Sequence, residues 1–73
     1  MYAIAVSGTE TFVKDASAEL ESKGFQKVSE GLYIIQSIQG FDGISQGLKH
    51  LRSYKEDRSK NIIYKTKNLM RQS

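Results

Sequence analysis

The sequence predicts an α+β protein with the ferredoxin-like element order βαββαβ, a four-stranded antiparallel sheet with two helices on one face. Three observations predict it: apolar runs of strand length alternate with helical stripes, glycines stand where elements end, and 73 residues allow one domain. Right-handed crossovers would place the first and third strands at the centre of the sheet. We expect the domain to span residues 1–67 and a basic C-terminal tail to span residues 68–73.

The first half of the chain predicts a strand, a helix and two more strands. Residues 2–7 form a short apolar run without a helical stripe, which indicates a buried strand. A helical stripe of apolar residues at steps of three and four follows, with Gly24 suited to end the helix and two capping candidates, Ser7 and Thr9. Residues 25–29 and 32–38 then predict two strands, separated by a Glu-Gly turn.

The second half predicts one helix and one strand. Phe41, Ile44, Leu48 and Leu51 step by three, four and three, which indicates an amphipathic helix that Asp42 can cap. The segment from Tyr54 to Lys60 is polar after Tyr54 and predicts a loop. Residues 61–65 predict the last strand.

The first strand is apolar on both of its faces. One face packs on helices, and the other lacks cover, so we expect a homodimer formed through the sheet or its edge strands. No apolar run approaches a membrane span and the N-terminus does not resemble a signal peptide, so we expect no membrane partner and a cytoplasmic location.

Charge is unevenly distributed along the chain. Residues 1–48 carry three lysines against six carboxylates, a net charge of −3, whereas residues 49–73 carry eight basic side chains against two carboxylates, a net charge of +6. The densest basic run is the best binding candidate of the chain, and it consists of Lys49, Arg52, Lys55, Arg58 and Lys60. These side chains suit RNA phosphates or an acidic protein, and the run also fits a solvated surface.

Other candidate sites are weaker. His50, the single histidine, is a weak catalytic candidate and a better candidate for a solvated side chain. With no cysteine and no second histidine, we predict no metal site, and the carboxylates of the first helix are expected to form its exposed face. Gly40, Gly43 and Gly47 lack a phosphate-loop pattern and predict a turn and close helix packing. Tyr33 and Tyr64 can stack on bases but fit core or dimer packing better.

Several short strings resemble the virulence-associated protein D family of small ferredoxin-like endoribonucleases. The strings are the opening MYAIA, then Gly24-Phe25 and Gly31-Leu32-Tyr33, and more weakly Leu48-Lys49-x-Leu51 and Lys60-Asn61-Ile62. The resemblance implies the fold, a dimer, and relatedness to the small nuclease-like subunit of CRISPR adaptation complexes. In that family an acidic residue follows the first strand where this chain has Ser7, and another enters the last strand where this chain has Asn61.

These departures lead to two functional hypotheses. A serine hydroxyl is a poor metal ligand and a poor base at neutral pH, so we favour a catalytically degenerate member that binds a partner in a toxin–antitoxin or phage-defence setting. The alternative is an active endoribonuclease with an atypical centre near Ser7 and His50. The first hypothesis requires no cofactor, and the second requires a divalent metal.

Overall fold

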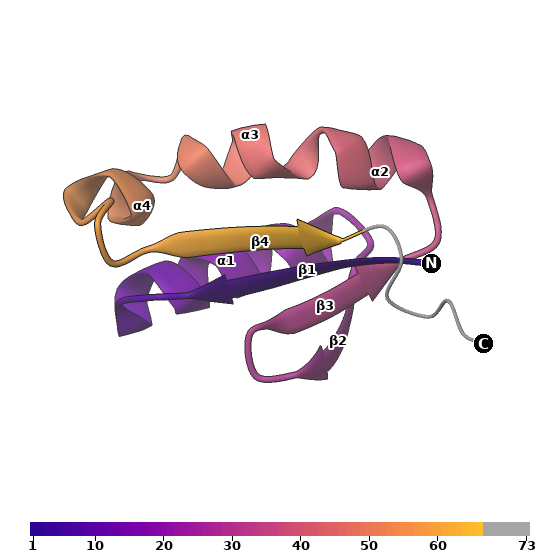
Figure 1. Ribbon diagram of the computed structural model, residues 1–73, viewed down its shortest axis with the longest axis horizontal. Helices are drawn as coiled ribbons and strands as arrows, with labels where there is room; N and C mark the ends of the chain where they lie inside the picture. Colours follow the sequence, from indigo (N-terminus) through magenta and orange to yellow (C-terminus); the bar gives the residue numbers. More distant parts are fainter. Residues whose placement is uncertain (67–73) are drawn as a thin grey trace.

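The computed structural model describes residues 1–66, and four strands and four helices succeed one another along them (Figure 1). The elements are β1 (Tyr2–Ser7), α1 (Glu10–Ser22), β2 (Gln26–Ser29), β3 (Leu32–Ile35), α2 (Ile38–Asp42), α3 (Ile44–Lys49), α4 (Arg52–Glu56) and β4 (Ile62–Thr66). The predicted tail, residues 68–73, lies outside the described residues. In residues 1–66, no helix is both long and apolar enough to cross a membrane.

The four strands form one antiparallel sheet in the order β2-β3-β1-β4. The predicted α+β class and four-stranded antiparallel sheet are therefore confirmed, and β1 and β3 lie at the centre as expected. In the register of the sheet, Ile4 lies opposite Tyr33 and Lys65, and Ala5 lies opposite Leu32 and Tyr64. Since strand side chains alternate between faces, these two rows belong to opposite faces of the sheet.

The hydrophobic core lies between the sheet and the helices. Ile4 and Val6 from β1 and Tyr33 from β3 pack with buried side chains of three helices, namely Phe12, Ala16 and Leu20 from α1, Phe41 from α2, and Ile44 and Leu48 from α3. The ring of Phe41 also stacks on Tyr2, with centroids 5.1 Å apart, and carries the Lys65 ammonium 4.5 Å above its centre. The helices therefore share one face of the sheet.

Of the two candidate capping residues, Thr9 and not Ser7 begins the first helix. Thr9 is the N-cap of α1, and its hydroxyl accepts a hydrogen bond of 3.2 Å from the Phe12 N–H. The expectation that Ser7 caps the helix is wrong, because Ser7 is still the last residue of β1. Gly24 follows the C-cap with a φ of 95°, which confirms it as the residue that ends the helix.

The predicted second helix is instead three short helices. The predicted third strand ends early, since Ser37 caps α2 by accepting from the Gly40 N–H at 3.2 Å. Asp42 ends α2 rather than starting a helix, and Gly43 separates α2 from α3. Leu51 then takes an extended conformation, and the segment predicted as a loop begins inside α4.

Candidate nucleic-acid interface

The five basic side chains of the predicted binding run gather around α4. Lys49 is the last residue of α3, Arg52 and Lys55 lie on α4, and Arg58 and Lys60 lie in the connection to β4. All five are exposed, and Figure 1 places α4 at the end of the molecule opposite the N-terminus. We call this set, Lys49, Arg52, Lys55, Arg58 and Lys60, the basic tip.

The charge of the basic tip is not neutralised by ion pairs. Among residues 1–66 the two ion pairs are Lys23 with Glu19 at 3.7 Å and Lys27 with Glu30 at 3.4 Å, and neither involves the basic tip. The carboxylates nearest in sequence are Glu56 and Asp57, and Asp57 accepts a hydrogen bond of 3.0 Å from the Ser59 hydroxyl. Five cations against two carboxylates leave residues 49–60 with a net charge of +3, which favours binding to anions.

A buried asparagine connects the basic tip to the rest of the fold. Asn61 is 3% exposed, and its amide group donates to the carbonyl oxygens of Ser53 at 2.8 Å and Tyr54 at 3.3 Å, both on α4. Its side-chain oxygen accepts from the Thr9 backbone N–H at 2.9 Å and from the Thr9 hydroxyl at 3.3 Å. One side chain thus joins α4, the start of α1 and the start of β4.

Two further contacts hold α4 against α1. The buried Ser53 hydroxyl donates to the Asp15 carboxylate at 2.8 Å, and the rings of Phe12 and Tyr54 lie 5.6 Å apart in a tilted arrangement. Asp15 was expected on the exposed face of the first helix, and it is exposed. Its carboxylate nevertheless accepts a hydrogen bond from Ser53 of α4. The helix at the centre of the basic tip is therefore held by buried and partly buried hydrogen bonds and by ring packing.

Close backbone packing beside Asn61 requires glycine at position 8. Gly8 has a φ of 137°, which side-chain-bearing residues rarely adopt. A Cβ atom there would lie 2.7 Å from the Asn61 Cα and 2.9 Å from the Lys60 carbonyl oxygen. The turn from β1 into α1 can therefore approach the end of the basic tip only without a side chain.

The structure does not assemble a catalytic pair from the two predicted candidates. Ser7 is exposed at the end of β1, opposite Ile62. His50 is exposed at the C-cap of α3, where its backbone N–H donates to the carbonyl oxygens of Gln46 and Gly47 at 3.2 Å. Within the described part of the chain, the Ser7 hydroxyl and the His50 ring form no hydrogen bond with each other.

Three carboxylates of the described structure bond to other side chains of the fold. Asp15 bonds to Ser53, Glu19 pairs with Lys23, and Glu30 pairs with Lys27. Nowhere in residues 1–66 do three or more side chains of histidine, cysteine, aspartate or glutamate group as metal ligands.

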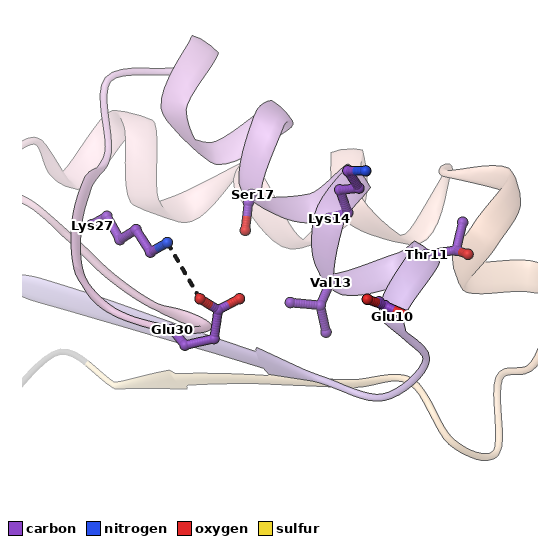
Figure 2. Close-up of a pocket in the computed structure, with 7 residues that line it drawn as sticks. All are labelled: Glu10, Thr11, Val13, Lys14, Ser17, Lys27 and Glu30. Atoms are coloured by element: carbon purple, nitrogen blue, oxygen red, sulfur yellow. Dashed lines mark hydrogen bonds and ion pairs between the residues drawn. The ribbon is translucent and has the colours of Figure 1, made fainter.

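A groove of about 890 Å³ lies between α1 and the β2–β3 turn (Figure 2). Glu10, Thr11, Val13, Lys14 and Ser17 line it from α1, and Lys27 and Glu30 line it from the other side. Figure 2 shows Val13 between Glu10 and the Lys27–Glu30 pair. Two cations and two carboxylates cancel in net charge here, so the groove does not select an anion as the basic tip does.

Gly43 and Gly47 differ in the space around their Cβ positions, and Tyr33 and Tyr64 differ in their exposure. Gly43 has open space around its Cβ position, so the predicted close packing at Gly43 is wrong, and Gly47 would make an ordinary contact with Glu19 at 3.5 Å. Tyr33 is fully buried in the core, as expected, whereas Tyr64 is 65% exposed.

Reasoning from the sequence did not find the network of Asn61, Ser53 and Asp15. Asn61 contacts Thr9, 52 residues earlier, and Ser53 contacts Asp15, 38 residues earlier. The available signal was a single asparagine immediately before an apolar strand, and a local pattern of that kind does not identify distant partners.

Comparison of the chain with protein-family models, with curated proteins and with solved structures gives no significant match in any of the three.

Proposed function

We propose that this chain is a non-catalytic nucleic-acid-binding protein, a degenerate relative of the virulence-associated protein D family, whose basic tip holds the phosphate backbone of RNA. We further propose that its fold is ferredoxin-like, with α2, α3 and α4 together in the place of the second helix. The strand order β2-β3-β1-β4 supports this fold, because it puts the first and third strands at the centre.

The observation that carries the proposal is the basic tip on an anchored helix. Its five cations are exposed, make no ion pair within residues 1–66 and outnumber the two carboxylates of the same segment, so they are accessible to phosphates. Because Asn61 holds two α4 carbonyl groups, the backbone of α4 that bears Arg52 and Lys55 keeps a defined position relative to the sheet. Phosphate binding needs such a positive surface and does not require a catalytic group.

The lack of a carboxylate at the end of β1 supports binding without catalysis. Ser7 stands where the resemblance expects an aspartate, and a serine hydroxyl is not ionised near neutral pH. Asn61 stands at the second expected acidic position, and its amide group and its oxygen both take part in hydrogen bonds within the fold. A divalent metal is part of the endoribonuclease alternative only.

The test compares two variants that lose equal charge. Lys55→Gln/Arg58→Gln/Lys60→Gln removes three cations from the basic tip, and Lys14→Gln/Lys23→Gln/Lys27→Gln removes three from elsewhere. We expect the first variant to bind fluorescein-labelled RNA at least tenfold more weakly in fluorescence anisotropy, and the second to bind within about threefold of the unmodified protein.

Three results would contradict the proposal. Equal losses in the two variants would mean that net charge alone attracts RNA. Absence of RNA binding by the unmodified protein would favour an acidic protein as the partner. Magnesium-dependent RNA cleavage that a chelator abolishes would favour the active endoribonuclease.

A further inference from the structure

The face of the sheet that points away from the helices carries no charged strand side chain among residues 1–66. Because strand side chains alternate, the residues opposite to the core row face this side, and they are Ala3, Ala5, Ser7, Gln26, Ser29, Leu32, Ile34, Ile62, Tyr64 and Thr66. We call this surface the open face. It lacks the charges that contact phosphate, and its side chains suit the flat apolar surface of a base instead.

The exposed large apolar side chains of the open face lie on the edge strand β4, whereas its exposed residues on β1 and β2 are the polar Ser7, Gln26 and Ser29. Tyr64 is 65% exposed and Ile62 is 54% exposed, whereas the central Ala3 is buried and Ala5, Leu32 and Ile34 are half-buried. Ala5 lies directly opposite Tyr64 in the register, and its single methyl group leaves room beside the tyrosine ring. The available apolar surface is thus a strip along β4 with an exposed aromatic ring in it.

The basic tip continues directly into this strip. Arg58 and Lys60 precede Ile62 in the chain, and the connection from α4 leads straight into β4 (Figure 1). Positive charge therefore lies at the end of β4 where the uncharged strip begins. A ligand that fits both parts has anionic groups on one side and planar apolar groups on the other, which describes a nucleic acid strand with accessible bases.

We propose that the open face is a binding site for single-stranded nucleic acid, in which a base stacks on Tyr64 while the adjoining phosphates contact Arg58 and Lys60. This inference rests on the proposed function and adds the substrate class to it. A duplex does not satisfy the site, because its bases stack on one another and are not free to lie on Tyr64. Every base has a π-face, so the site tolerates many sequences.

A second copy of the chain fits the open face less well. A standard protein interface covers about 800 Å² on each partner. Of the large apolar side chains assigned to this face, the two exposed ones lie on one edge strand, and the central Ala3, Ala5, Leu32 and Ile34 are buried or half-buried. Dimerisation through this face is nevertheless one of the outcomes that the experiment distinguishes.

The experiment measures binding of a fluorescein-labelled oligouridylate of about ten nucleotides, a length within the range of single-strand sites. Tyr64→Leu removes the ring and keeps an apolar side chain, and Tyr64→Phe keeps the ring as the matched control. We expect Tyr64→Leu to weaken binding about tenfold and Tyr64→Phe to change it less than twofold. Affinity for an RNA duplex of equal length is expected to be the same in all three proteins.

A second measurement reads the stacking directly. The chain has no tryptophan, so Tyr64→Trp introduces a single tryptophan at the proposed contact, whose fluorescence can be excited separately from that of the tyrosines. We expect its fluorescence to be quenched when the oligouridylate binds and to be unchanged when the duplex binds. Circular dichroism of each variant verifies that it is folded.

The outcomes separate this inference from the proposed function. Unchanged oligouridylate binding by Tyr64→Leu, together with weakened binding by the variant of the basic tip, would overturn the inference and leave the proposed function in place. Loss of all nucleic-acid binding in the unmodified protein would overturn both. Conversion of a dimer into a monomer by Tyr64→Leu in sedimentation would assign the open face to a second copy and overturn the inference.

Discussion

Asn61 determines where the basic tip lies, although it carries no charge itself. Its amide group donates to two carbonyl groups of α4, and its oxygen accepts from Thr9, the N-cap residue of α1. A buried side chain with both donors and acceptors in use is difficult to replace, because any substitute leaves some of the bonded groups without a partner.

Replacement of Asn61 by alanine is expected to lower the free energy of unfolding by about 1–3 kcal/mol. The Thr9 N–H and the Ser53 carbonyl would lose their partner at a site that is 3% exposed in the native protein. Urea unfolding measures the effect. Ser59→Ala serves as the control, since within residues 1–66 its exposed hydroxyl bonds only to Asp57, and a loss as large as that of Asn61→Ala would argue against the buried network.

The hydroxyl of Tyr33 is buried, and within residues 1–66 it has no hydrogen-bond partner. Tyr33→Phe removes this unpaired group and keeps the ring in the core, so we expect the free energy of unfolding to rise by about 1 kcal/mol. Thermal and urea unfolding give the comparison with Tyr64→Phe, whose exposed ring should make stability insensitive to the hydroxyl. A destabilised Tyr33→Phe protein would mean that the hydroxyl does have a partner.

At the scale of elements, α1 and the second helical segment differ in their continuity. α1 runs for 13 residues with a side-chain cap and an apolar stripe in which Phe12, Ala16 and Leu20 are buried. The second segment contains three glycines, and its α2, α3 and α4 have five, six and five residues. Glycine weakens helices by roughly 1 kcal/mol relative to alanine, so packing of Phe41, Leu48 and Tyr54 decides the path of this chain segment.

The start of α1 provides a test of the capping assignment. Thr9→Ala is expected to lower the free energy of unfolding by about 1–2 kcal/mol, because the Phe12 N–H loses its acceptor. Ser7→Ala is expected to change it by less than about 0.5 kcal/mol, since Ser7 is an exposed strand residue. Thr9→Ser, which keeps the hydroxyl, should restore most of the stability. Equal costs at positions 7 and 9 would contradict this assignment.

At the scale of the whole molecule, charge is separated along the fold. Most carboxylates lie on α1 and near the β2–β3 turn, and the cations of the basic tip lie around α4. The open face between the edges of the sheet carries no charged strand side chain among the described residues. The homodimer expected from the two-sided apolar first strand stays a prediction, and sedimentation at several concentrations tests it.

RNA affinity is expected to depend steeply on salt. For single strands the slope of the logarithm of affinity against the logarithm of salt concentration is about −0.7 per contacted phosphate, so five contacts correspond to about −3.5. The variant that lacks Lys55, Arg58 and Lys60 should show a slope smaller by about 2. Anisotropy titrations at several potassium chloride concentrations measure both slopes. A flat response would show that the basic tip does not contact phosphate.

The α+β class, the order of the strands and the positions of β1 and β3 could be predicted from the sequence, because hydrophobic periodicity is a local property and right-handed crossovers are a general rule. It also located the basic tip, since its five cations are close together in the sequence. Only the tertiary structure decided that Asn61 joins Thr9 to α4 and that Tyr64 is exposed while Tyr33 is buried. Tyr33 and Tyr64 both lie on strands, but Tyr33 lies on the face of the sheet that the helices cover and Tyr64 lies on the opposite face. That choice depends on how distant segments pack, and so does every bond that Asn61 makes with Thr9, which lies 52 residues away.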